Sequence, residues 1–346
     1  MLQPDVTRIG RVAVDKNDGM KSTLVDRLVL AATVVIFCAA IVVLYHEFAS
    51  VSPHDALASL AALPAHQILA AAGLTAASYL LLTGYDFLAL RYVQRKLRYR
   101  DVLLASFTAF VFSNNIGFQL LSGGSTRYRI YSSFGLGAVE IGEIVVFCTF
   151  TYALGVITVG GLLALAEPAV IAALLDLPQP VISAAGLVLL GCSAAYLAAA
   201  AVWSRPIAIH RFRLRPPSMN LATAQVALAS FDAVLAGAVM YVLLPADLDI
   251  TYQAYLGIYV IAATMSVLSL VPGGFGVFEA AVTLMTAPPS KAAALAAFFA
   301  YRMIYFIVPL AIAIVCFALH ESRRKAGAHS KALRSSRRSR PIKFRE

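Results

Sequence analysis

Long apolar runs separated by short polar segments dominate this sequence. A helix that crosses a bilayer needs about 20 consecutive apolar residues. Runs of this kind cover residues 28–45, 67–90, 139–165, 181–202, 221–244 and 292–319. The pattern therefore predicts an all-α polytopic membrane protein with about six full transmembrane helices.

Two further apolar segments are interrupted near their centres. Segment 102–134 contains SNNIGFQLLSGGS, and segment 252–286 contains VPGGFG. Proline donates no backbone hydrogen bond, and irregular backbone persists at membrane depth only where protein or water satisfies it. We therefore expect two re-entrant helical hairpins that line a polar cavity. The expected break residues are Asn114, Asn115, Gly123, Gly124, Pro272, Gly273, Gly274 and Gly276.

Composition supports a membrane protein, because 60% of the residues are hydrophobic and 13% are charged, whereas about a quarter are charged in soluble domains. The distribution of charge predicts the topology. Basic residues gather at 1–27, 91–100, 203–217 and 321–346, and basic loops stay in the cytoplasm. Acidic or nearly uncharged loops at 46–66, 166–180 and 245–250 are expected outside.

This topology divides the chain into three expected parts. They are a cytoplasmic N-terminal segment at 1–27, a transmembrane domain at 28–320, and a basic disordered cytoplasmic tail at 321–346. Both termini lie in the cytoplasm of a cell with an inner membrane. One full span lies between each pair of loops assigned to opposite sides, so each interrupted segment must return to the side from which it entered. The two hairpins are therefore expected to enter the membrane from opposite faces.

The transmembrane domain reads as two inverted pseudo-repeats, with halves at about 28–165 and 181–320. Each hairpin follows a span that carries an aromatic residue and an aspartate, Tyr85-Asp86 in the first half and Phe231-Asp232 in the second. A span, a hairpin and a span, repeated in opposite orientation, is the plan of many transporters, whose site lies where the broken elements meet.

Charged residues inside the second half are the first site candidates. Arg302 is about ten residues into its span, so it lies roughly 15 Å deep. An arginine at that depth needs a partner, and we expect it to face Glu279, Asp232 or a lipid phosphate. Glu279 and Asp232 either balance charge in a lipid site or hold helices together.

The first half offers a second candidate group. Arg127 and Arg129 follow Gly123-Gly124, where Ser125 or Thr126 could cap a new helix and its free amides could form an anion site. The other interpretation is that Glu140 and Glu143 neutralise these arginines. Asp86 is expected near the end of its span, in an interfacial pair with Arg91 or Arg95.

Enzyme chemistry finds little support in the sequence. All six histidines fall in loops or at span ends, the four cysteines have no metal-binding spacing, and no hydrolase, metalloprotease or phosphate-loop motif occurs. No catalytic residue, cofactor or metal site is therefore expected. The basic tail follows a hydrophobic helix without a folded nucleic-acid module, which favours contact with anionic lipid over nucleic acid.

Three blocks in order resemble the transmembrane region of the lysylphosphatidylglycerol synthase/flippase family, the multiple peptide resistance factors. They are SGGSTRYRIYSSFGLGAVEIGEIV at 122–145, PGGFGVFE at 272–279 and YRMIYFIVP at 301–309. The resemblance spans roughly residues 20–320. It implies a region that moves aminoacylated phospholipid between leaflets, whereas a separate soluble domain of that family transfers the amino acid from tRNA. Only 26 residues follow residue 320, so we expect a stand-alone form without the aminoacyltransferase domain.

The functional hypothesis is a phospholipid translocase of the inner membrane, with aminoacyl-phospholipid as one candidate cargo. Arg127, Arg129 and Arg302 would hold the headgroup, and Glu279 and Asp232 would balance charge or carry protons. Two alternatives stay open, an accessory subunit of a separately encoded envelope-lipid or hopanoid enzyme and a structural membrane scaffold. The expected partners are membrane phospholipids and such an enzyme, and a homo-oligomer is left open.

Overall fold

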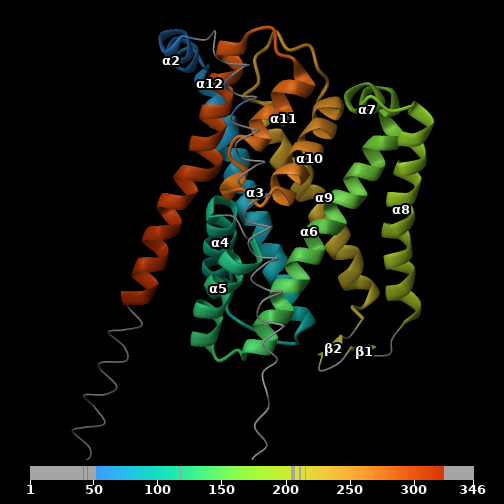
Figure 1. Ribbon diagram of the computed structural model, residues 1–346. Helices are drawn as coiled ribbons and strands as arrows, with labels where there is room; N and C mark the ends of the chain where they lie inside the picture. Colours follow the sequence, from blue (N-terminus) through green and yellow to red (C-terminus); the bar gives the residue numbers. More distant parts are fainter. Residues whose placement is uncertain are drawn as a thin grey trace, which may run out of the picture.

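The computed structural model describes residues 52–116, 119–203, 207–209, 212–214 and 216–322, together with Val42 and Tyr45 (Figure 1). Five of the described helices are long and apolar enough to cross a membrane. They are α3 (Ala65–Tyr92), α6 (Ala138–Ala166), α8 (Gln179–Val202), α9 (Met219–Tyr241) and a last helix at Lys291–Ser322. The predicted all-α membrane class is confirmed, and these helices match five of the predicted spans.

The remaining predicted span, 28–45, lies outside the described residues except for Val42 and Tyr45. The N-terminal segment 1–27 and the tail beyond Ser322 also lie outside them. Glu321 and Ser322 belong to the last helix and not to the predicted tail at 321–346. The total number of spans stays a prediction.

The last helix changes its winding partway along. It begins as α12 (Lys291–Tyr301), continues as a π-helical turn, η3 (Arg302–Ile307), and returns to α-helix up to Ser322. Pro309 has no N–H to offer the carbonyl of Tyr305, four residues earlier, so a regular α-helix would leave that carbonyl without a donor. Tyr79 supplies the missing donor, because its hydroxyl bonds the Tyr305 carbonyl at 3.1 Å.

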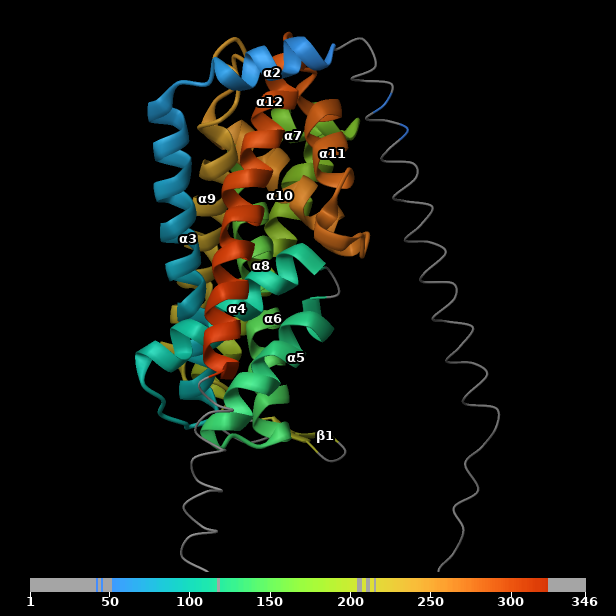
Figure 2. The same cartoon turned by 90° about the vertical axis from the view of Figure 1, so that its left-hand side faces the viewer.

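Two pairs of shorter helices fill opposite ends of the bundle. The first pair is α4 (Tyr99–Ile116) and α5 (Gln119–Tyr131), and the second is α10 (Tyr252–Leu268) and α11 (Val277–Thr286). Figures 1 and 2 show the first pair towards one end of the long axis and the second towards the other. This arrangement suits two hairpins of opposite orientation, although their entry into a membrane stays a prediction.

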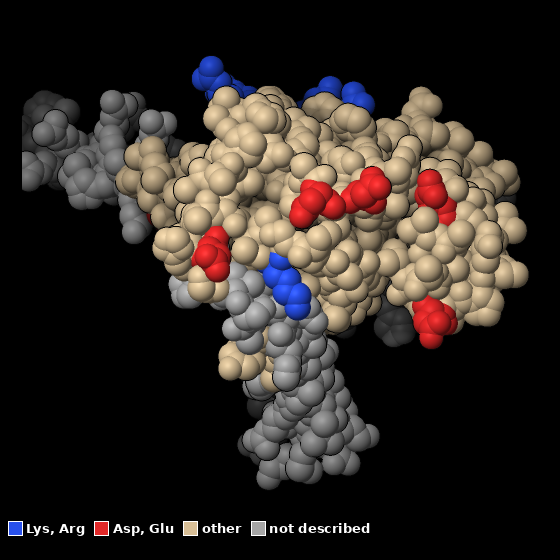
Figure 3. Space-filling view, turned by 90° about the horizontal axis from the view of Figure 1, so that it is seen from above, with Lys and Arg blue, Asp and Glu red and all other residues tan. Residues whose placement is uncertain are grey.

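The short connecting elements also separate by end. Helices α2 (Pro53–Ala61) and α7 (Pro168–Leu175) lie at one end, and the strands β1 (Ile207–Ile209) and β2 (Phe212–Leu214) lie at the other (Figure 1). The strands form a small antiparallel hairpin inside the predicted loop 203–217. Figure 3, which views the end with α2 and α7, shows scattered acidic side chains and few basic ones.

The second hairpin turns through backbone that glycine permits. A 3₁₀ turn, η2 (Pro272–Gly274), separates α10 from α11, and Gly273, Gly274 and Gly276 have φ values of 62°, 61° and 80°. Such positive φ angles are costly for residues with a Cβ atom. The position of Gly273 is also crowded, since a Cβ atom there would lie 3.3 Å from the Asn115 carbonyl oxygen. The tips of the two hairpins therefore meet.

The end of α4 and the start of α5 both lie inside the predicted interruption at 113–125, but not at its glycine pair. Helix α4 extends through Asn114 and Asn115 to Ile116, and α5 begins at Gln119. Gly123 and Gly124 lie within α5, so the prediction that they mark the break is wrong. The glycine has a packing role instead, because a Cβ atom at Gly123 would lie 2.2 Å from the Ser113 hydroxyl oxygen on α4.

The long helices approach closely where small residues meet. A Cβ atom at Gly155 of α6 would lie 2.6 Å from the carbonyl oxygen of Ala229 on α9, which places these two backbones in direct contact. Helix α9 also packs along α3. As a result, the two aspartate-bearing helices of the predicted repeats lie side by side at the centre.

Candidate functional site

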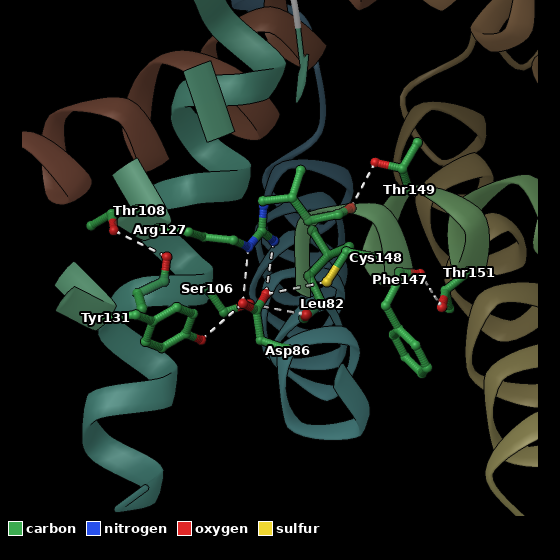
Figure 4. A network of polar contacts seen from close by, with 12 residues as sticks. Leu82, Asp86, Ser106, Thr108, Arg127, Tyr131, Phe147, Cys148, Thr149 and Thr151 are labelled. Atoms are coloured by element: carbon green, nitrogen blue, oxygen red, sulfur yellow. Dashed lines mark hydrogen bonds and ion pairs between the residues drawn. The ribbon is translucent and has the colours of Figure 1, made fainter. Parts of the chain in front are cut away.

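Helices α3 and α5 meet at a buried ion pair. The Nε and Nη2 atoms of Arg127 donate to the two carboxylate oxygens of Asp86 at 2.9 and 2.8 Å (Figure 4). The Tyr131 hydroxyl donates to Oδ1 at 2.8 Å, and the Cys148 thiol approaches Oδ2 at 3.9 Å. The Phe110 ring covers the guanidinium, with 4.7 Å between its centroid and Cζ. Both charges are thus paired and withdrawn from solvent.

This pair corrects the interpretation of Asp86. We expected an interfacial partner, Arg91 or Arg95, but Asp86 is completely buried and bonds Arg127. Arg95 instead forms a more exposed pair with Glu140 at 2.7 Å, and the Glu140 hydrogen bond raises the pKa of the Arg95 guanidinium. The suggestion that Glu140 neutralises Arg127 or Arg129 is therefore wrong.

The expected helix start near Arg127 is absent from the described structure. The hydroxyls of Ser125 and Thr126 donate to the Ser122 carbonyl within α5, so neither residue caps a helix. Amides inside a helix are already bonded and cannot bind an anion. Arg129 is exposed, and it bonds Glu321 at the end of the last helix at 3.1 Å. The two arginines thus connect α5 to two different helices.

The second hairpin is closed by a comparable pair. Arg302 Nε donates to Glu279 Oε1 at 2.5 Å, and the Gly276 N–H donates to Glu279 Oε2 at 3.0 Å. Arg302 also donates to the carbonyls of Gly273 and Gly274 at 2.6 and 3.3 Å. Of the three partners proposed for Arg302, Glu279 is the one that it contacts.

Aromatic rings complete the surroundings of Arg302. Its Cζ atom lies 4.3 Å from the centroid of Phe275 and 4.6 Å from that of Phe306. Such contacts stabilise a guanidinium that has lost its water. Arg302 therefore holds the irregular turn to the last helix, which is a structural role that its sequence position alone did not establish.

Asp232 forms no comparable ion pair with any residue that the structure describes. It lies on α9 with 6% of its surface exposed, and it accepts a hydrogen bond from the Tyr85 hydroxyl to Oδ2 at 2.9 Å. Its other oxygen, Oδ1, has no hydrogen-bond partner among the described residues. The expectation that Asp232 could face Arg302 is not met, because the Arg302 side chain bonds Glu279 and the hairpin turn.

Hydroxyl groups of Ser78, Tyr85 and Tyr305 lie near this carboxyl group. Ser78 Oγ and Tyr305 Oη are 3.2 Å apart, and the neighbouring Tyr79 hydroxyl bonds the Tyr305 carbonyl. Asn115, at the tip of the first hairpin, donates to the Phe306 carbonyl at 3.5 Å. Polar groups from α3, α4, α9 and the last helix therefore converge at the level of the two hairpin tips.

An apolar groove lies on the other side of Tyr79. It has a volume of about 630 Å³ and runs between α3, α4 and the last helix. Its lining residues are Ala72, Thr75, Ala76, Tyr79, Leu80, Arg100, Leu103, Leu104, Phe107, Ile304, Val308, Pro309, Ile312 and Cys316. Arg100 is the only charged residue of this set, and it forms no ion pair within the part of the chain that the structure describes.

Sequence reasoning missed the roles of Tyr85 and Asp86, and it missed the groove. Tyr85 was noted only as half of a repeated dipeptide, although its hydroxyl is the donor to Asp232. Asp86 is 41 positions from Arg127, a separation at which pairing cannot be read from helical periodicity. The signal that could have found both is an ionisable residue deep in a spanning helix, which requires an internal partner.

Similarity to known proteins identifies the family of this chain. Residues 21–313 match the model of the lysylphosphatidylglycerol synthase transmembrane region. An uncharacterized protein of Synechocystis sp. is 32% identical over 284 residues, which cover 80% of this chain and 88% of that protein. Inner membrane protein YbhN of Escherichia coli is 32% identical over 267 residues, 75% of this chain and 81% of that protein.

A larger protein matches over a part of its length. The phosphatidylglycerol lysyltransferase of Staphylococcus haemolyticus is 23% identical over 322 residues, which are 90% of this chain and 36% of the lysyltransferase. The match to the family model covers most of the chain and includes both ion pairs and Asp232. The chain therefore belongs to the family of the lysylphosphatidylglycerol synthase transmembrane region.

Proposed function

We propose that this protein moves phospholipid between the leaflets of a bacterial inner membrane. The groove between α3, α4 and the last helix is the observation that carries the proposal. Its walls are largely apolar, and Arg100 at the start of α4 is the one charged residue among its lining residues. An acyl chain suits such walls, and a guanidinium suits the phosphate of an anionic headgroup.

Charge around the groove supports the same type of ligand. Arg100 follows Arg95, Lys96 and Arg98 in the short connection between α3 and α4. Basic segments next to spanning helices attract anionic lipids, with each Lys or Arg contributing about 1 kcal/mol. The relatives named as phosphatidylglycerol lysyltransferases also favour an anionic or aminoacylated glycerophospholipid as cargo, and YbhN favours the inner membrane.

The proposal assigns new roles to the predicted site residues. Arg127 and Arg302 have their charges paired, so they hold the two hairpins in place rather than bind the headgroup in this conformation. Glu279 belongs to the same closure, and Arg129 to the contact with the last helix. The headgroup instead enters beside Arg100 and passes along the groove towards Asp232 and the hydroxyl groups near it.

The test is lipid movement in proteoliposomes that contain fluorescent phosphatidylglycerol. Ala76→Trp should fill the groove and slow movement at least tenfold, whereas Leu187→Trp, on the exposed face of α8, should retain the wild-type rate. Arg100→Gln should slow anionic lipid more than zwitterionic lipid, and Arg98→Gln, which does not line the groove, serves as its control. Equal rates for Ala76→Trp and Leu187→Trp would contradict the proposal.

A structural scaffold is the second candidate, and the two fully paired arginines favour it. A scaffold needs its ion pairs only for packing, so apolar replacement of both members of a pair can preserve stability. Under this alternative, Glu279→Leu with Arg302→Met would leave every cellular phenotype unchanged, and the purified protein would move no lipid. The accessory-subunit alternative predicts instead that a lipid-modifying enzyme co-purifies with the chain.

A further inference from the structure

Asp232 stands apart from the other buried charged residues. Among the residues that the structure describes, five charged side chains are buried: Asp86, Arg127, Asp232, Glu279 and Arg302. Four of them form the two ion pairs described above. Asp232 has one hydrogen bond from Tyr85 and an oxygen with no partner. Within the described ranges, the structure therefore has an interior carboxyl group that no cation neutralises.

The groups that face Asp232 are neutral hydroxyls. Helix α3 contributes Tyr85, Ser78 and Tyr79, α6 contributes Tyr152, and the last helix contributes Tyr305. The other two elements packed along α9 each have one tyrosine that is engaged elsewhere, while Tyr255 of α10 has no hydrogen-bond partner among the described residues. Tyr196 of α8 bonds Gln225, and Tyr252 of α10 bonds the Val234 carbonyl.

An isolated carboxylate is expensive in such a place, because burial removes its water and no nearby positive charge replaces that water. A hydroxyl neighbour can donate to a carboxylate, but it can also accept from a carboxylic acid. The hydroxyl groups near Asp232 are therefore compatible with both protonation states. An ion pair of the type that Asp86 forms would fix the charge permanently.

We propose that Asp232 is a proton-binding site, and that binding and release of this proton couple a proton gradient to lipid movement. The proton goes to Oδ1, the oxygen without a donor, while Tyr85 continues to donate to Oδ2. Binding converts a carboxylate into a neutral carboxylic acid, and release to water reverses the change. The coupling to lipid movement rests on the proposed function, whereas the proton site itself does not.

The position of Asp232 next to the groove makes this coupling mechanically direct. Ser78 lies beside Asp232 and shares a hydrogen bond with the Tyr305 hydroxyl. Tyr79, the next residue along α3, lines the groove and bonds the Tyr305 carbonyl. A change in the charge of Asp232 therefore acts on the residues that hold α3 to the last helix. These two helices are two of the three walls of the groove.

Infrared difference spectroscopy of the purified full chain tests the proton site. The wild type at neutral pH should show the carbonyl stretching band of a protonated carboxyl group, and the band should shift in heavy water. Asp232→Asn should lose that band, whereas Glu140→Gln, a control at a carboxylate paired with Arg95, should keep it. Tyr85→Phe should move the band, because it removes the hydrogen bond to Oδ2. If Asp232→Asn does not fold, the shift in Tyr85→Phe decides the same point.

Proteoliposomes with an imposed pH gradient test the coupling. The wild type should move lipid faster with the gradient than without it, and Asp232→Asn should show the same rate in both conditions. A band present equally in wild type and Asp232→Asn would overturn the proton site. A wild-type rate that ignores the gradient would overturn the coupling. Lipid that fails to move in any proteoliposome, with the infrared band in place, would overturn the proposed function and leave the proton site standing.

Discussion

Asp86 and Asp232 occupy matching positions in the two predicted repeats, yet their surroundings are opposite. Asp86 accepts two hydrogen bonds from Arg127 and one from Tyr131, whereas Asp232 accepts one from Tyr85. The preceding aromatic residues differ as well, since Tyr85 is buried and Phe231 is 58% exposed. One aspartate therefore holds α5 to α3, and the other is the proposed proton site.

The difference arises from where each half places its arginine. In the first half Arg127 is on the second helix of the hairpin and reaches the aspartate of α3. In the second half Arg302 is on the last helix and closes the hairpin through Glu279, so among the described residues no arginine pairs with Asp232. Both halves stabilise their hairpin with one ion pair, but only the first uses the aspartate to do so.

The largest effect should come from breaking the anchor, the ion pair between Asp86 and Arg127. Arg127→Met leaves Asp86 charged and buried, which should lower the free energy of unfolding by about 3–5 kcal/mol. Adding Asp86→Leu should recover most of that loss, because the uncompensated charge is then removed. Denaturant unfolding of the purified protein in detergent measures both. A single variant as stable as the wild type would show that the anchor does not hold the first hairpin.

Opening the second hairpin should cost somewhat less. Arg302→Met removes a pair that is slightly more exposed than the Arg127 pair, and Glu279 keeps the hydrogen bond from the Gly276 N–H. We expect a loss of about 2–4 kcal/mol in the free energy of unfolding. Limited proteolysis between α10 and α11 should become faster in this variant. Unchanged cleavage at that turn would separate the ion pair from hairpin closure.

Packing between α4 and α5 should come next, because it positions Arg127. Gly123→Ala brings a methyl group against the Ser113 hydroxyl, and we expect a cost of about 1–3 kcal/mol in the free energy of unfolding. Combining it with Ser113→Ala should recover most of this loss, with Ser113→Ala alone as the reference. An additive double mutant would contradict the close approach of the two helices.

Asp232 should give the smallest effect on stability. Asp232→Asn breaks no ion pair, and the amide oxygen can still accept from Tyr85, so we expect a change of at most about 1 kcal/mol. Thermal unfolding of Asp232→Asn and of Arg127→Met under the same conditions compares the two losses of stability. A loss as large as that of Arg127→Met would mean that Asp232 is also an anchor, and the contrast between the two aspartates would disappear.

Hydrophobic patterning was sufficient for the spans, because a bilayer demands long apolar helices. The five described spanning helices begin and end within a few residues of the predicted runs. The partners of buried charges were harder to predict. Depth along a helix follows from counting residues, but the face on which Asp86 meets Arg127 depends on packing between segments 41 residues apart.

Glycine gave an ambiguous signal for the same physical reason. Gly273 and Gly274 have positive φ values at a turn, whereas Gly123 and Gly124 lie in a helix, and Gly123 packs against α4. A missing side chain permits either use, and sequence alone does not distinguish them. The π-helical turn was equally invisible, since it depends on Tyr79 bonding the Tyr305 carbonyl that Pro309 leaves unpaired.

That π-helical turn can act as a hinge in the last helix. The turn is held by two hydrogen bonds. Tyr79 of α3 donates to the Tyr305 carbonyl, and Asn115 of the first hairpin donates to the Phe306 carbonyl. The helix beyond it carries Val308, Ile312 and Cys316 along the groove and ends near Glu321, which Arg129 holds. A small change of helix direction at this turn would displace the residues after it by an amount that grows along the helix. The width of the groove therefore depends on the same turn that contacts both hairpins.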